Sequence, residues 1–306
     1  MNLHGDRATF DSLVAAIWHA GRNNVVPPES LAAALEQRGC PKDVLPLSDS
    51  MEGFRFVHRQ LEEGELYWVT NSCPQEREVE VSFRVSGRKP VVLHAETGLT
   101  EEVSYTIRNG RTSVRLNFAP DDALFVWFGE PAEQDSVALP PVTFYPLCRL
   151  HGPWQVAFQP RRGAPDTALF DTLISFSRSS LPGIRYFSGT AVYTQSFVWD
   201  SAGVDADALF LDLGEVRHLA RVFLNGRDLG LAWKAPYRLP VEGWLRNGVN
   251  RLEIHVTNTW ANRLIGDLQP DAPEKITWTS YPYFHPNTPL DEAGLLGPVR
   301  IVGRVR

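Results

Sequence analysis

Apolar and polar residues follow two different periods along this chain, and the helical period comes first. In the first fifty residues, apolar side chains recur every three or four positions, at Phe10, Leu13, Val14, Ile17 and Trp18. This spacing predicts an amphipathic helix. A second helical run covers residues 30–36, after a pair of prolines, and residues 24–26 between them predict one short strand. Because a single strand cannot form a sheet alone, residues 1–50 are interpreted as the helical remnant of a preceding α/β domain.

From residue 54 onward, apolar residues occupy every second position, which is typical of half-buried strands. This alternation predicts strands at residues 54–59, 66–70, 79–85 and 90–94. Asn109-Gly110 then predicts a hairpin, because both central residues of a type I′ turn need a positive φ. Residues 51–130 are therefore expected to form a small antiparallel β-sandwich.

A second strand-rich region follows a proline-containing stretch at residues 130–141, which is the best candidate for a linker. Alternation predicts strands at residues 208–213, 220–224 and 251–256, and Asn225-Gly226 marks another hairpin. Helical periodicity is almost absent here. Residues 142–306 therefore predict a second β-sandwich or a jelly roll, and the whole chain is expected to be mostly β.

Composition narrows the classes of partner. The 306 residues are 43% apolar and 22% charged, and the net charge is -6, as expected for a folded protein. No long basic run is present, so neither nucleic acid nor an anionic membrane surface is an expected partner. No apolar run is long enough to span a bilayer. The three cysteines lie far apart and are interpreted as free thiols.

The first residues lack a basic stretch followed by an apolar core, so no signal peptide is recognised. The chain as written is expected to be cytoplasmic, an expectation that would not apply to a fragment of a secreted enzyme.

Four motifs in the second half resemble the galactose-binding-like jelly roll of family 2 glycosidases, and their order along the chain also agrees. They are Gly183–Tyr193, Leu211–Val216, Val222–Gly226 and Gly230–Tyr237. The resemblance implies that residues 142–306 form a galactose-binding-like domain.

Two further motifs, Asn262–Asp267 and Gly294–Val299, resemble the C-terminal domain of α-L-rhamnosidases of glycoside hydrolase family 106. Weaker similarity extends through Tyr67–Asn71 and Glu96–Gly98 to residues 21–31. The family's catalytic barrel, with its acid and base carboxylates, has no counterpart in this chain, so no catalytic residue is assigned. The resemblance implies a carbohydrate partner and a catalytic barrel on a separate domain or chain. No cofactor is assigned, and a calcium ion in the jelly roll remains an open alternative.

The acidic residues do not form an obvious catalytic pair. Glycoside hydrolysis uses two carboxylates separated by roughly 5 to 9.5 Å. Asp212, Asp228 and Glu253 lie in predicted strands or turns, where a solvated charge is the ordinary interpretation. Glu96 and Asp267, in apparent loops, are the acids least easily explained in this way. His255 is expected to point outward from its strand.

Aromatic residues concentrate in the last quarter of the chain, largely outside the predicted strands. Sugar rings stack their C–H faces on such side chains, and neighbouring amide, guanidinium and carboxylate groups can fix the hydroxyls. The candidate carbohydrate-binding residues are Trp233, Tyr237, Trp260, Asn262, Arg263, Asp267 and Trp278. Two other interpretations remain open: any one ring can fill a sandwich core, and the loop at residues 258–267 can dock on a neighbouring domain.

Three hypotheses follow. An accessory, non-catalytic region of a rhamnosidase-like hydrolase predicts an exposed apolar face within residues 1–50. A free-standing carbohydrate-binding module predicts sugar affinity without such a face. A glycosidase in its own right requires a carboxylate pair in a cleft.

Overall fold

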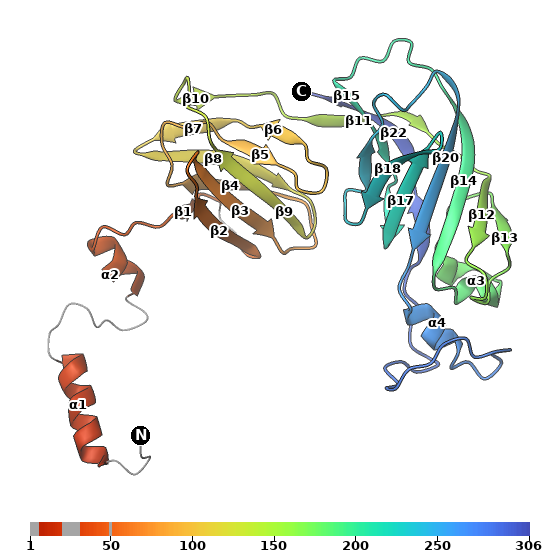
Figure 1. Ribbon diagram of the computed structural model, residues 1–306, viewed down its shortest axis with the longest axis horizontal. Helices are drawn as coiled ribbons and strands as arrows, with labels where there is room; N and C mark the ends of the chain where they lie inside the picture. Colours follow the sequence, from red (N-terminus) through yellow and green to blue (C-terminus); the bar gives the residue numbers. More distant parts are fainter. Residues whose placement is uncertain (1–5, 20–30, 49–50) are drawn as a thin grey trace. The chain divides into compact units, whose positions relative to one another are not determined.

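The computed structural model describes residues 6–19, 31–48 and 51–306, and it divides into two compact units (Figure 1). The N-terminal unit comprises residues 1–138 and the C-terminal unit residues 139–306. The division falls within the stretch 130–141, where the sequence suggests a linker. The short strand predicted at residues 24–26 lies outside the described residues.

Two helices open the chain, α1 (Arg7–His19) and α2 (Leu31–Gln37). Their apolar side chains are exposed: Phe10, Leu13, Ile17 and Trp18 of α1 are 65%, 60%, 57% and 51% accessible. Leu31 and Leu35 of α2 are also exposed. The helical spacing predicted from the sequence is confirmed, and its apolar stripe faces outward in the described structure.

The rest of the N-terminal unit is a sandwich of two five-stranded antiparallel sheets (Figure 1). One sheet has the order β1 (Val44–Pro46), β4 (Arg77–Phe83), β8 (Arg111–Phe118), β7 (Tyr105–Arg108) and β10 (Ser136–Val137). The other has the order β2 (Phe54–Gln60), β3 (Glu65–Asn71), β9 (Asp122–Phe128), β5 (Val91–Leu93) and β6 (Thr100–Glu102). Strands β1 and β10 extend the sandwich beyond the expected limits of residues 51–130.

Alternate side chains along the strands form the core of this sandwich. Every second side chain of β9 is buried, which places Leu124, Val126 and Phe128 between the sheets. At the β7–β8 hairpin, Asn109 and Gly110 have φ values of 53° and 74°, as the type I′ signal requires.

The C-terminal unit contains a six-stranded and a four-stranded antiparallel sheet, with an additional two-stranded pair. The larger sheet has the order β13 (Thr167–Phe170), β12 (Trp154–Phe158), β14 (Thr190–Trp199), β20 (Gly248–Thr257), β17 (Leu219–Leu224) and β18 (Arg227–Ala232). The smaller has the order β11 (Thr143–Arg149), β22 (Arg300–Val305), β15 (Ala208–Asp212) and β19 (Arg238–Pro240). The pair is β16 (Glu215–Arg217) with β21 (Gly294–Gly297), and three short helical segments are η2 (Phe176–Arg178), α3 (Pro182–Arg185) and α4 (Ala261–Gly266). The expected mostly β fold of two antiparallel sandwiches is confirmed.

Aromatic side chains fill the core of this second sandwich. Trp154, Phe176, Phe187 and Tyr193 are each at most 1% accessible. The Tyr193 hydroxyl accepts a hydrogen bond from the amide of Leu295 at 3.0 Å, and burial raises the pKa of this hydroxyl. The phenol is therefore a neutral, satisfied member of the core.

Asp212 corrects one sequence-based expectation. Its position on a strand suggested a solvated charge, but the residue is 3% accessible. Its Oδ2 lies 3.1 Å from both Arg238 Nε and Arg300 Nη2, and its Oδ1 accepts the amide hydrogen of Gly214. Two cations and a backbone donor compensate the buried carboxylate, as a buried charge requires.

Candidate functional site

The most unusual part of the C-terminal unit follows α4. Residues 268–293, between α4 and β21, form neither helix nor strand (Figure 1). This stretch, called the 268–293 segment below, contains several of the aromatic residues that the sequence brings to notice.

Asn262, on α4, holds the far end of the segment. Its Nδ2 donates a hydrogen bond to the carbonyl oxygen of Asp291 at 2.8 Å, and its Oδ1 accepts one from the amide of Asp291 at 2.9 Å. Asn262 is 2% accessible, so this amide side chain pairs with the backbone much as a neighbouring strand would.

Asp267, which directly follows α4, binds the first half of the 268–293 segment. Its Oδ2 accepts hydrogen bonds from the amides of Ile276 and Thr277, at 3.0 and 2.6 Å, and from the Thr277 hydroxyl. Its Oδ1 lies 2.8 Å from Nη2 of Arg263, and both side chains are only 6% accessible. A buried ion pair with additional backbone donors fixes geometry because neither charge can move to solvent without leaving the other unpaired.

Between these two attachments, three large aromatic side chains project into solvent. Trp278 is 86% accessible, Tyr281 61% and Tyr283 74%. The rings of Tyr281 and Tyr283 contact each other edge to face, with centroids 4.7 Å apart. Trp278, Tyr281 and Tyr283, three exposed rings within six consecutive residues, are called the aromatic patch below.

The other predicted aromatic residues occupy different environments. Trp260, which precedes α4, is 47% accessible and lies under the Arg162 guanidinium, 4.5 Å from the ring centroid. Trp233 is 54% accessible. Tyr237 is half-buried, and its hydroxyl donates a hydrogen bond to the carbonyl oxygen of His218 at 3.3 Å. Burial raises the pKa of the Tyr237 hydroxyl. Tyr237 therefore packs against the sandwich, whereas the two tryptophans offer ring surface to solvent.

The structure thus separates the predicted site residues into two groups. Trp233, Trp260 and Trp278 are exposed, whereas Asn262, Arg263 and Asp267 are turned inward. Asn262 and Asp267 bind backbone groups, and Arg263 pairs with Asp267. The polar loop expected at residues 258–267 includes a short helix, α4. Sequence reasoning did not select Tyr281 or Tyr283, although their position in a proline-containing run without alternation is the signal that could have identified them.

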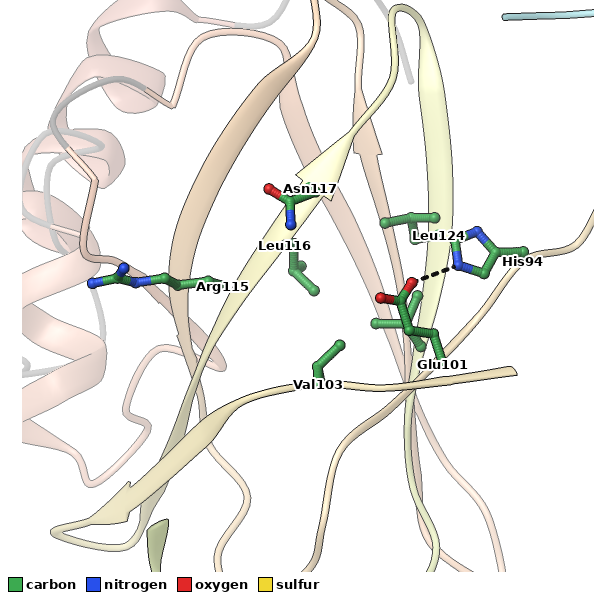
Figure 2. Close-up of a pocket in the computed structure, with 8 residues that line it drawn as sticks. His94, Glu101, Val103, Arg115, Leu116, Asn117 and Leu124 are labelled. Atoms are coloured by element: carbon green, nitrogen blue, oxygen red, sulfur yellow. Dashed lines mark hydrogen bonds and ion pairs between the residues drawn. The ribbon is translucent and has the colours of Figure 1, made fainter. Parts of the chain in front are cut away.

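A pocket in the N-terminal unit lies beside β5, β6 and β8 (Figure 2). Its volume is about 30 Å³, room for water-sized molecules but not for a sugar ring. His94 Nε2 lies 3.1 Å from Glu101 Oε2, and Figure 2 shows Arg115 extending away from this pair. The lining residues are Val92, His94, Glu101, Val103, Arg115, Leu116, Asn117 and Leu124.

A charged cluster surrounds His58 elsewhere in the same unit. Its Nδ1 lies 3.3 Å from Asp43 Oδ2 and its Nε2 2.8 Å from Glu65 Oε2, while the ring stacks on Tyr67. Burial opposes ionisation of Asp43, but hydrogen bonds from Arg84 and His58 outweigh it and lower the pKa of Asp43. The cluster ties the residues before β1 to the sandwich.

The remaining carboxylates singled out from the sequence have ordinary surroundings. Asp228 pairs with Arg221. Glu253 Oε1 lies 2.6 Å from Nε2 of His255, which faces outward. Glu96 is exposed in a turn. Among the described residues, no group of three or more His, Cys, Asp or Glu side chains is placed to hold a metal ion. No helix within the described ranges is long and apolar enough to cross a membrane.

Comparison with protein families finds two matches, one near each end of the chain. Residues 2–107 match the model of the α-L-rhamnosidases of glycoside hydrolase family 106, and residues 178–281 match the galactose-binding-like domain of glycoside hydrolase family 2. The solved rhamnosidase from Novosphingobium sp. PP1Y is 40% identical, with a TM-score of 0.83 over 97% of this chain and 29% of that one. This chain resembles part of a family 106 α-L-rhamnosidase.

A curated protein of Formosa agariphila that carries the provisional name β-glucuronidase is 37% identical over 176 residues, or 50% of this chain and 15% of that protein. The chain spans less than a third of either relative. The resemblance inferred from motifs is confirmed. The family 106 match covers the first third, where the motifs are weaker, and includes both α1 and α2.

Proposed function

We propose that this chain is the non-catalytic, carbohydrate-binding accessory region of an α-L-rhamnosidase-like glycoside hydrolase. It acts with a catalytic domain, which belongs to the same protein or to a separate chain. Glycoside hydrolase-related domains, one of them galactose-binding-like, support the carbohydrate part of this proposal.

The observation that carries the proposal is the apolar stripe of α1. Phe10, Leu13, Ile17 and Trp18 recur at helical spacing and are all more than half exposed. Burying a side chain of this size contributes roughly 1.5–3 kcal/mol, so the stripe is suited to packing against another domain. Because the family 106 match includes α1, that domain is expected to be the catalytic one.

The surroundings of the acidic residues support a non-catalytic role. A glycosidase needs one carboxylate to protonate the leaving group and a second to act as base or nucleophile. The three buried aspartates among the described residues have other functions. Asp212 neutralises two arginines, Asp267 pairs with Arg263 and accepts backbone amides, and Asp122 accepts the amides of Ala119 and Ala123.

A free-standing carbohydrate-binding module is the second candidate. The exposed aromatic patch favours it, since such a module needs ring surface and no partner. The apolar stripe of α1 favours the accessory role instead, because a free-standing module has no use for it.

Co-purification tests the proposed function. The chain is co-expressed with the Novosphingobium rhamnosidase from which the region matching this chain has been removed. Recovery of the two together is expected for the wild-type chain. The double substitution Phe10→Asp and Ile17→Asp on the stripe is expected to abolish it.

Ser12→Asp with Ala15→Asp is the matched control, because at 100° per residue these positions lie on the opposite side of α1. The proposal fails if the wild-type chain recovers no partner, or if the stripe variant recovers as much as the control.

A further inference from the structure

We propose that the aromatic patch, Trp278, Tyr281 and Tyr283, is a binding site for neutral, hydroxyl-rich sugar rings. This inference rests on the proposed function in taking carbohydrate as the ligand, and it goes beyond that function by naming the surface and the class of sugar.

Folding does not account for the exposure of the patch. Large aromatic rings stabilise a fold when they are buried, as Trp154 and Phe187 are in the same unit. The three rings of the patch instead expose 61% to 86% of their surface. Exposed tryptophan and tyrosine grouped on one segment are typical of recognition surfaces.

The backbone that carries the patch is held on both sides. Asp267 binds the amides of Ile276 and Thr277, immediately before Trp278, and Asn262 binds both backbone groups of Asp291. Between them, the side chain of Gln269 donates to the carbonyl of Pro286 at 2.9 Å. A surface held in this way loses less conformational entropy on binding than a free loop would.

The chemistry of the patch fits a sugar ring. Ring faces receive the C–H face of a pyranose, and the two phenol groups both donate and accept hydrogen bonds, as sugar hydroxyls do. The 268–293 segment also contains Thr279, Ser280 and Asn287, which are small, neutral and polar. The Thr279 hydroxyl donates to the carbonyl oxygen of Tyr281 at 2.9 Å, so Ser280, Asn287 and the two phenols are the neutral polar groups that the segment offers to a sugar.

The charge of the 268–293 segment favours neutral sugars over acidic ones. The 268–293 segment carries four carboxylates, on Asp271, Glu274, Asp291 and Glu292, and a single lysine, Lys275. Arg178 pairs with Glu292, so three carboxylates stand against one lysine. This excess of negative charge repels a uronate and leaves a neutral sugar unaffected. The patch is thus expected to discriminate against glucuronic acid.

Saturation-transfer NMR on the 306-residue chain tests the proposal, with methyl α-L-rhamnoside and methyl β-D-glucuronide as probes. The wild-type chain is expected to bind the rhamnoside more tightly than the glucuronide. Trp278→Ala is expected to weaken rhamnoside binding about tenfold, the usual effect of losing a central tryptophan. Tyr281→Ala with Tyr283→Ala is expected to weaken it similarly.

Trp68→Ala is the matched control, because Trp68 is exposed on β3 of the other unit. Unchanged rhamnoside affinity in Trp278→Ala, tighter binding of the glucuronide, or no binding of the rhamnoside by the wild-type chain would each overturn the proposal. So would a Trp278→Ala variant that binds the sugar normally but no longer co-purifies with the catalytic domain, since the patch would then be a docking surface.

Failure here is distinguishable from failure of the proposed function. The accessory role depends on the apolar stripe of α1 and is read from co-purification, whereas the patch is read from sugar binding. A chain that co-purifies with the catalytic domain and binds no sugar would retain the accessory role and lose only this inference.

Discussion

The core of the C-terminal unit and the 268–293 segment are both rich in aromatic residues, and they use them in opposite ways. Strands β12 and β14 turn every second side chain inward, so Trp154 and Tyr193 are each 1% accessible. In the 268–293 segment, the backbone is bound by the side chains of Asn262 and Asp267, which precede it in the chain. Trp278 of this segment is 86% accessible.

This difference teaches that aromatic content alone does not decide whether a ring is buried, and that the pairing of the backbone differs between the two regions. In a sheet, ladder hydrogen bonds satisfy the backbone and free the side chains to pack. At the segment, the buried side chains of Asn262 and Asp267 bind backbone groups, and Trp278, Tyr281 and Tyr283 are exposed, although Phe284 is partly buried. Five substitutions test these assignments, four in the C-terminal unit and one in the N-terminal unit.

Trp154→Ala is expected to have the largest effect. It removes a side chain that is 1% accessible at the centre of the core and leaves a cavity behind. The free energy of unfolding of the C-terminal unit should fall by about 3–5 kcal/mol. Urea denaturation followed by circular dichroism measures this, and a change below about 1 kcal/mol would contradict the assigned core.

Asp212→Ala comes next, because it leaves Arg238 and Arg300 without their shared carboxylate. Both arginine side chains are about a third exposed, at 29% and 33%, so water compensates part of the loss. A cost of about 2 kcal/mol is expected, below the roughly 3–5 kcal/mol of a fully buried pair. Glu253→Ala on the outer face of β20 is the control, with an expected change within about 0.5 kcal/mol. Equal effects would refute the burial of Asp212.

Asn262→Ala should loosen the 268–293 segment while the sheets remain folded. Two hydrogen bonds to Asp291 are lost, each worth about 1 kcal/mol. Amide hydrogen exchange of Asp291 should accelerate by roughly tenfold or more, while the amides of β14 and β20 keep their protection. Uniform acceleration across the unit would mean that the segment does not open by itself.

Asp43→Asn should change how the stability of the N-terminal unit depends on pH and leave the C-terminal unit unaffected. The lowered pKa of Asp43 means that its contribution to stability is present above the usual carboxyl pKa and is lost as pH falls through the lowered value. The substitution should reduce the stability of the N-terminal unit at pH 7 by less than about 1 kcal/mol and flatten its loss below about pH 4. Thermal melts at pH 7 and pH 3 test this. An altered transition of the C-terminal unit would contradict the assignment.

Trp278→Ala should have the smallest effect on folding. A side chain that is 86% accessible leaves no cavity, so the free energy of unfolding should change by no more than about 0.5 kcal/mol. A loss comparable to that of Trp154→Ala would show that Trp278 packs into the fold.

Local patterns predicted much of this fold. Alternation identified strands such as β17 and β20, and Asn225-Gly226 adopts the positive φ values, 53° and 79°, that its turn signal requires. Predictions failed where a polar residue depends on partners distant in sequence. Asp212 is buried by Arg300, which lies 88 positions further along the chain, and no local pattern reveals that pairing.

The candidate site was only partly predictable for the same reason. Trp260 and Trp278 were selected as candidate sugar-binding rings, with a place in the core left open, and both are exposed. The inward orientation of Asn262 and Asp267 depends on hydrogen bonds to backbone groups 29 and 9 positions away, Asp291 and Ile276. Composition shows which groups are available but not which way they face.

Hydrolysis of nitrophenyl α-L-rhamnoside tests the accessory role most directly. The purified chain is measured alone, against a heat-treated sample of itself, and together with the co-expressed catalytic domain. We expect no release of nitrophenol by the chain alone, and release by the pair that falls when Phe10 and Ile17 are changed to aspartate. Turnover by the chain alone, above the heat-treated control, would contradict it and would place a catalytic carboxylate pair within the sandwiches.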